Sequence, residues 1–147
     1  MKEFERKQLL ERINREAATV GVDIPDAIDV QGDEVELRDF VFEIKRRDTI
    51  PASEQDRVDR AKKNLRRERR ERLQELESGD IPYDRGERLA ESIIGIDRAL
   101  NALEQLQPVD LEQEADVQEA ADQKRWMSFL KQALGHEDGG RTTGSRP

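Results

Sequence analysis

LAESIIGIDRALNAL, residues 89–103, carries large apolar side chains at successive steps of four, three, four and three residues. They are Leu89, Ile93, Ile96, Leu100 and Leu103. This seven-residue repeat places them on one narrow stripe of an α-helix, as in helix pairs of the coiled-coil type. Asp84 and Glu87 form a start resembling a capping box, and Pro108 marks the end. The pattern predicts a helix over residues 84–107 that buries its stripe against a second helix.

The preceding stretch supplies that second helix. Its apolar residues also follow a helical stripe: Val58, Ala61, Leu65, Leu73 and Leu76. Ser53 is a suitable N-cap and Gly79 a suitable C-terminal stop, so the helix is expected over residues 53–78. Arg69 interrupts the stripe, and its stem could lie along the groove with its charged head in water. Because only the short loop 79–83 separates the two helices, they should form an antiparallel hairpin.

Two further helices are expected to pack against this hairpin. Apolar residues recur at helical spacing over residues 2–19 and again in the second half of 110–134. Residues 136–147 are polar and rich in glycine, which is typical of a disordered tail. The sequence therefore predicts a mainly α fold, in a single helical domain over residues 1–135.

A small β-hairpin is expected over residues 27–38. Apolar residues alternate on either side of a Gly32-Asp33 turn. Glycine at the first central position favours a type II′ turn. The next segment, 39–47, is predicted as a short helix because Phe40, Val41 and Ile44 share a helical face. Phe40, Phe42 and Ile44 alternate equally well, so a third strand is the alternative.

The amino-acid composition favours a helical fold and adaptation to high salt. Only 34% of residues are hydrophobic and 41% are charged, which suits helices with narrow apolar seams. There are 34 acidic residues and 19 Arg but only 7 Lys. Such carboxylate-rich, lysine-poor chains are typical of molar salt, where the Debye length of about 3 Å screens self-repulsion. A GC-rich genome, which favours Arg over Lys, is the alternative explanation.

The chain offers no sign of export or of a membrane span. It has no cysteine, which excludes disulfides and thiol chemistry. The charged N-terminus lacks the apolar region of a secretory signal, and no apolar run approaches about 18 residues. We expect a cytoplasmic protein that does not enter a membrane.

The basic segment RVDRAKKNLRRERRER, residues 57–72, reverses the sign of the chain. It holds nine basic and three acidic residues, a net charge of +6 in a chain of −8. Its candidate anion-binding or partner-binding residues lie at three- and four-residue helical spacing: Lys62, Lys63, Arg66, Arg67, Arg69 and Arg70. Such an array could contact several phosphates of RNA. The alternative is a solvated face paired with the chain's own carboxylates, and we favour it.

Trp126 and Phe129 are the one aromatic pair at helical spacing. They could dock on a partner, or they could cover the protein's own core. We favour the core, since a chain this poor in aromatic residues needs them inside.

Motifs for catalysis or cofactor binding are absent from the sequence. His136 has no second histidine or cysteine to share a metal, and no phosphate-binding loop, HExxH or EF-hand pattern occurs. We expect no enzyme activity, no cofactor, no metal and no small-molecule substrate.

Two segments carry a family resemblance. IPDAIDVQGDEVELRDFVFEIKRRD, residues 24–48, and GERLAESIIGIDRALNALEQL, residues 86–106, resemble an uncharacterised family of small acidic helical proteins from haloarchaea. The resemblance covers most of residues 1–134. It implies salt adaptation and carries no activity and no binding residue.

Two function classes remain. The first is a non-catalytic adaptor or assembly protein that binds another protein through helical surfaces, a homodimer included. The second is binding of RNA or a ribonucleoprotein through the basic segment. Carboxylates within about 4 Å of Arg66, Arg67, Arg69 and Arg70 would favour the first class, and unpaired outward-facing arginines the second.

Overall fold

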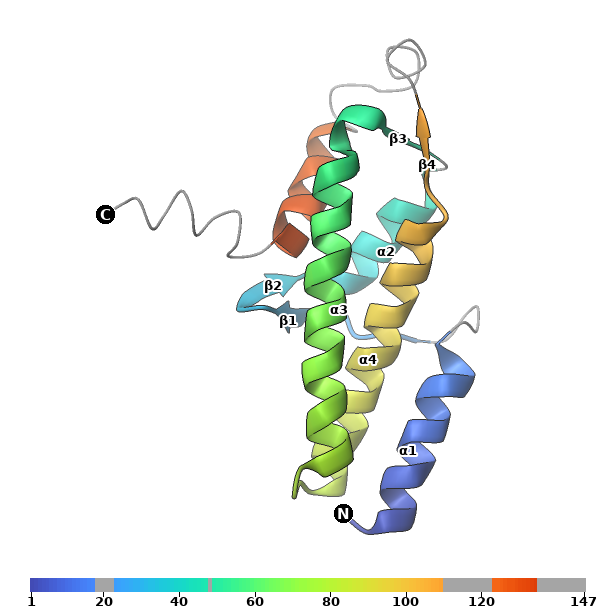
Figure 1. The fold of residues 1–147 in the computed structure, drawn as a ribbon, viewed down its shortest axis with the longest axis vertical. Helices are drawn as coiled ribbons and strands as arrows, with labels where there is room; N and C mark the ends of the chain where they lie inside the picture. The colour runs from blue at the N-terminus through green and yellow to red at the C-terminus, as the bar shows by residue number, and fades with distance from the viewer. Residues whose placement is uncertain (18–22, 48, 110–122, 135–147) are drawn as a thin grey trace, which may run out of the picture.

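A computed structural model describes residues 1–17, 23–47, 49–109 and 123–134. It is mainly helical with a small antiparallel β-hairpin, as predicted (Figure 1). The elements, in chain order, are α1 Glu3–Glu16, β1 Ile28–Val30, β2 Asp33–Val35, α2 Leu37–Lys45, β3 Thr49–Pro51, the 3₁₀ turn η1 Ala52–Glu54, α3 Gln55–Ser78, α4 Tyr83–Glu104 and β4 Gln107–Val109. Residues 123–134 form a further helix. The predicted first half of that helix and the predicted tail lie outside the described residues.

The spine is the antiparallel pair of α3 and α4, which run side by side along the longest axis of the molecule (Figure 1). Residues on both predicted stripes are buried between these helices and their neighbours: Leu65, Leu76, Leu89, Ile93, Ile96 and Leu103. Leu73 and Leu100 are partly buried against the same core. The stripe of α4 is thus buried within one chain. The predicted antiparallel pairing of the two long helices is confirmed.

The core divides into two apolar clusters along this spine. At the end near the α3–α4 loop, Leu9 and Ile13 of α1 pack with Leu76, Leu89 and Ile93. The N-terminal ammonium also donates to the Ile81 carbonyl oxygen across 2.9 Å. In the second cluster, the β-hairpin, α2 and the 123–134 helix pack against the other half of the α3–α4 pair.

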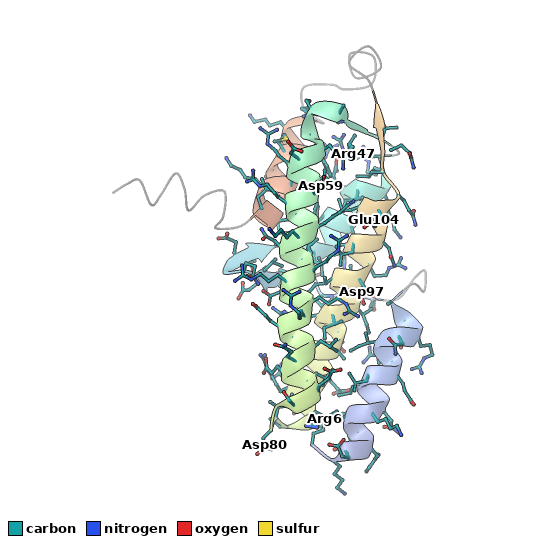
Figure 2. All side chains as sticks on the ribbon, viewed as in Figure 1. Arg6, Arg47, Asp59, Asp80, Asp97 and Glu104 are labelled. Atoms are coloured by element: carbon teal, nitrogen blue, oxygen red, sulfur yellow. The ribbon has the colours of Figure 1, made fainter. Side chains whose placement is uncertain are left out.

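Arg6 fixes α1 to the end of α3. Its Nε donates to the Leu76 carbonyl oxygen across 3.0 Å, and its Nη2 donates to the Gly79 carbonyl oxygen across 2.8 Å. Carbonyl groups in the last turn of a helix lack helical partners, so this guanidinium satisfies two groups that would otherwise be bare. Figure 2 shows Arg6 at that end of the molecule.

Helix α2 lies directly against α4. A Cβ atom on Gly95 would stand 2.5 Å from Cδ2 of Leu37, so any other residue there would force the Leu37 side chain to shift. Phe40, Val41 and Ile44 are buried on one face, which confirms helix over strand for this segment. Leu37 was predicted in the hairpin strand, but it begins α2, and its side chain fills the space over Gly95.

The turn of the β-hairpin lies one residue earlier in the chain than the predicted Gly32-Asp33 turn. Val30 pairs with Asp33, so the loop is Gln31-Gly32. Gln31 has φ 50° and Gly32 has φ 94°, the two positive values of a type I′ turn. Both registers put Val30 and Val35 on the buried face, and therefore the alternation of apolar residues could not distinguish them.

Helix starts and one strand pair also differ from expectation. Ser53 lies in η1 and does not cap α3, which begins at Gln55. Asp84 and Glu87 lie inside α4, whose N-cap is Pro82, so no capping box forms. Helix α4 ends at Glu104 and not at residue 107, because β4 pairs in parallel with β3. Short parallel pairs between distant segments leave no local signal.

Candidate functional site

Two cations of the basic segment meet one carboxylate on the neighbouring helix. Arg66 Nη2 lies 2.8 Å from Oε2 of Glu104, and Lys62 Nζ lies 3.5 Å from Oε1 of the same residue. Both contacts join α3 to the last turn of α4. They are partly exposed and are therefore each worth little in high salt.

Arg69 makes the tightest pair of the segment. Its Nε donates to Oδ1 of Asp97 on α4 across 2.7 Å, with the two side chains only 31% and 15% exposed. Burial raises the pKa of Asp97 above its ordinary value of 3.8, although the hydrogen bond and charge of Arg69 act to lower it. Figure 2 shows Asp97 and Glu104 along α4 beside α3. The residue that interrupts the apolar stripe thus joins the two helices.

Arg72 extends the same pattern to the β-hairpin. Its guanidinium contacts Glu68 Oε2 at 2.8 Å, Ser92 Oγ at 3.1 Å and the Asp29 carbonyl oxygen at 2.8 Å. One side chain therefore ties α3 to α4 and to β1. This arginine is structural.

Three other cations of the segment, Lys63, Arg67 and Arg70, face solvent. Arg67 lies 3.6 Å from Glu71 on its own helix, and both are more than half exposed. Lys63 and Arg70 are exposed and make no ion pair within the part of the chain that the structure describes. Of the four arginines singled out by the sequence, Arg66, Arg67 and Arg69 each face a carboxylate within about 4 Å, and Arg70 does not.

Trp126 leaves no surface with which to dock on a partner. Its side chain is fully buried in the core with Phe40, 6.3 Å between ring centroids. Its Nε1 donates to Oε1 of Glu54 across 2.6 Å, and the Arg47 guanidinium lies 4.7 Å from its ring centroid. Phe129 is partly buried on the same cluster. Trp126 and Phe129 therefore pack in or against the protein's own core, as favoured from the sequence.

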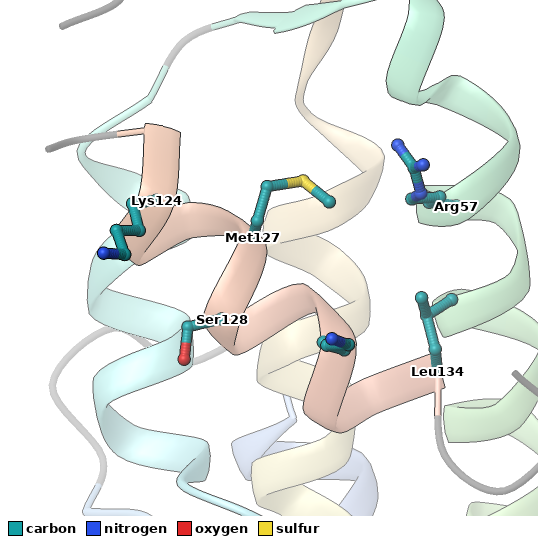
Figure 3. A pocket seen from close by; sticks show the side chains of 6 residues that line it. Arg57, Lys124, Met127, Ser128 and Leu134 are labelled. Carbon is teal, nitrogen blue, oxygen red and sulfur yellow. The ribbon is translucent and has the colours of Figure 1, made fainter. Parts of the chain in front are cut away.

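A cationic groove separates α3 from the 123–134 helix. It encloses about 480 Å³ and is lined by Arg57, Lys124, Met127, Ser128, Lys131 and Leu134. Figure 3 shows Met127 reaching from the 123–134 helix toward Arg57 of α3. None of its three cations makes an ion pair with a described residue. The groove therefore presents positive charge over an apolar floor.

A second depression, the α2 pocket, lies beside the most exposed large apolar side chain of the described chain. Phe42 on α2 is 66% exposed. The pocket encloses about 300 Å³ and is lined by Asp23, Ile24, Arg38, Val41, Phe42, Lys45 and Arg98. Arg38 is held by Asp26 at 3.3 Å and by the Ile24 carbonyl oxygen at 2.8 Å. Arg98, on α4, is only 9% exposed.

Sequence reasoning missed Phe42 and Arg98 as candidates. Phe42 falls off the stripe formed by Phe40, Val41 and Ile44, so a helix over this segment already implies an outward aromatic ring. Arg98 had no such signal. Its burial depends on residues 23 and 24 and on α2, which reach α4 from elsewhere in the chain.

The described residues hold no group of three His, Cys, Asp or Glu side chains that could bind a metal ion. Among the same residues, none of the helices has the length and apolarity that crossing a bilayer requires. The features of the described residues that could bind a partner are therefore charged surface depressions, the cationic groove and the α2 pocket among them, and the exposed Phe42 ring beside the α2 pocket.

Comparison with known proteins gives one match. No curated protein and no solved structure matches the chain. The profile of a family of unknown function, DUF5788, matches residues 1–131, which is most of the 147-residue chain. The chain therefore belongs to the DUF5788 family.

Proposed function

We propose that this is a non-catalytic adaptor or assembly protein, and that it binds a protein partner at the α2 pocket. The observation that carries the proposal is Phe42, 66% exposed at the rim of a pocket that also contains Arg98. Aromatic and arginine side chains around a depression are enriched at protein interfaces and supply most of their binding energy. Because so much of this apolar ring is in contact with water, covering it with another surface would be energetically favourable.

The internal ion pairs of the basic segment support a protein partner over RNA. Arg66, Arg69 and Arg72 are each held by carboxylates or carbonyl groups of this chain. A phosphate would have to displace those contacts. In molar salt, where phosphate affinity falls steeply, that exchange is unfavourable.

We also propose a salt-adapted, haloarchaeal cytoplasm as the setting. The 34 acidic residues against 7 lysines support it, since such a surface is hydrated and its repulsion is screened at high ionic strength. The proposal predicts a melting temperature that rises from dilute buffer to molar KCl. A flat or falling profile would contradict it.

Site-specific photo-crosslinking in the native organism tests the docking surface. A benzoylphenylalanine at Phe42 should give a protein adduct of defined mass that survives RNase treatment. Phe4 on α1 is the matched control, because it is also an exposed helical phenylalanine, at 58%, and does not line the α2 pocket. Equal adducts at both positions, or an adduct at Phe42 that RNase removes, would contradict the proposal.

The cationic groove supports RNA or ribonucleoprotein binding as a second candidate. Arg57, Lys124 and Lys131 line it without a carboxylate among its lining residues, and exposed Lys63 and Arg70 lie on the same helix as Arg57. If these cations contact phosphates, changing Lys124 and Lys131 to Gln should weaken RNA binding. It should also reduce the slope of log affinity against log salt by about 0.7 per contact. An unchanged slope would exclude this candidate.

A further inference from the structure

Arg98 is a buried cation without a counter-ion among the described residues. It is 9% exposed, and it makes no ion pair or hydrogen bond with any of them. Asp23, the one carboxylate that lines the same pocket, is exposed and does not pair with it. None of its guanidinium nitrogens is a fully buried atom without a partner, so the charged head meets water at the wall of the α2 pocket while the rest of the side chain is buried. The guanidinium is thus held in place with no counter-ion from the described residues, and it is free to bind one.

The two buried carboxylates among the described residues, Glu43 and Glu54, both have partners. Glu43, 4% exposed, accepts a hydrogen bond from Arg125 Nε at 2.9 Å and lies within 3.7 Å of Arg46 and Arg47. Glu54, equally buried, accepts hydrogen bonds from Trp126 and Gln123. Arg98 departs from this pattern, and it does so at the wall of a pocket that opens to solvent.

The walls of the α2 pocket define what would fit it. Lys45 is a second cation without an ion pair in the described chain, and Arg38 is already held by Asp26. Ile24, Val41 and Phe42 supply apolar surface. A binding group that covered this pocket without bringing a negative charge would bury Arg98 further, at a cost. A carboxylate group would instead accept a bidentate pair of charge-assisted hydrogen bonds from the guanidinium.

We infer that the partner inserts a carboxylate side chain, Asp or Glu, against Arg98, with an adjacent apolar side chain on Phe42 and Val41. This inference rests on the proposed function and names the chemistry that its surface recognises. Phe42 argues for a protein over a small anion, because a small ligand in the pocket would leave most of the ring in water. Asp23 at the rim argues for a single carboxylate over a doubly charged phosphate.

The placement also suits high salt. Salt screens exposed charges strongly, and buried or partly buried pairs much less. A carboxylate held in a pocket by Arg98 would keep its attraction where an exposed surface pair would lose it. Specific recognition in molar salt therefore favours a charge that is recessed and has apolar neighbours.

The free protein provides the first part of the test. Arg98→Met replaces the cation with an apolar chain of similar reach, so the melting temperature should stay equal or rise. Arg69→Met is the matched control, because it removes an arginine that is paired with Asp97, and the melting temperature should fall. If Arg98→Met lowers the melting temperature as much as Arg69→Met, Arg98 is structural and the inference is wrong.

Peptide selection provides the second part. A phage library of random twelve-residue peptides is selected against the full chain in molar KCl. We expect peptides with Asp or Glu beside Leu, Ile or Phe, whose binding Phe42→Ser abolishes and Arg98→Met weakens at least about tenfold. Arg98→Lys keeps the charge but cannot donate two parallel hydrogen bonds, so it should weaken peptide binding less than Arg98→Met does.

The other outcomes separate the two proposals. Peptides that need Phe42 but lack acidic residues and ignore Arg98→Met would overturn the inference and leave the docking surface standing. Peptides unaffected by Phe42→Ser would overturn both the surface and the inference. Preferential binding of a single-stranded RNA oligonucleotide at Arg98 would overturn the assignment of a protein carboxylate.

Discussion

Arg69 on α3 and Asp97 on α4 are joined by a 2.7 Å hydrogen bond from Nε to Oδ1. The arginine occupies a position where the apolar stripe of α3 is interrupted, and the aspartate follows directly after Ile96 of the facing stripe. The two side chains are mostly shielded from solvent, so salt weakens this pair less than an exposed pair. The basic segment thus contributes to the contact between the two long helices.

Arg69→Gln should lower the free energy of unfolding by about 1 kcal/mol, because it leaves Asp97 without its charged donor. For a domain of this size that is a fall in melting temperature of roughly 3 °C. Arg70→Gln is the matched control. Arg70 is adjacent and exposed and has no ion pair in the described chain, so its loss should change stability by less than about 0.5 kcal/mol. Equal effects in thermal melts would refute the structural role of Arg69.

Asp97 should make stability depend on pH in a defined direction. Its pKa is raised in the folded protein by burial, against the opposing effect of Arg69. The folded state therefore binds the proton more tightly than the unfolded state, and the contribution of this group falls as pH rises through the folded pKa. Relative to Asp97→Asn, the wild-type melting temperature should improve as pH falls from about 7 toward 4. A difference that stays constant or shrinks on acidification would show that the pKa is not raised.

Asn64 should anchor the 123–134 helix. Its buried Nδ2 donates to the carbonyl oxygens of Ala133 and Leu134 at 3.1 and 2.6 Å, which satisfies the last turn of that helix. Asn64→Ala should cost about 2 kcal/mol, and Asn64→Asp more at neutral pH, because a carboxylate would face two carbonyl oxygens. Hydrogen exchange should locate the loss in residues 123–134. Fast exchange confined to α1 would contradict this assignment.

Glu54 should act as the buried acceptor for the single tryptophan. Glu54→Ala leaves the Trp126 N–H group without its partner, and we expect a loss of about 2 kcal/mol with a red shift of the native fluorescence. Glu54→Gln keeps an acceptor oxygen and should perturb both less. If the two variants have the same emission and the same stability, the hydrogen bond is not what holds the ring.

Periodicity sufficed for the spine of the fold. Leu89, Ile93 and Ile96 repeat over two heptads, and the loop to α3 is too short for any arrangement but an antiparallel pair. These features depend on the spacing of residues within one segment, which a single sequence shows directly. A helix was the preferred prediction for residues 39–47, but the apolar spacing fitted a strand equally well, and only the structure decides for α2.

Contacts between distant segments had no such signal. The pairing of β3 with β4 and the burial of Arg98 under residues from α2 both arise from tertiary packing. The hairpin turn failed for another reason, since two registers bury Val30 and Val35 alike. The ionic partners of the basic segment were predicted as a class, but Asp97 and Glu104 could be selected only with both helices in place.

The measurement that tests this account most directly is the yield of protein partner crosslinked per folded molecule, compared between two variants. The Arg66→Gln, Arg69→Gln double variant should melt lower and, well below its melting temperature, retain the full yield. Phe42→Ser should melt as wild type does and lose the adduct formed by a crosslinker at Lys45, which lines the same pocket. The reverse pattern, with the yield lost in the arginine variant and retained in Phe42→Ser, would place recognition on the basic segment and contradict the account.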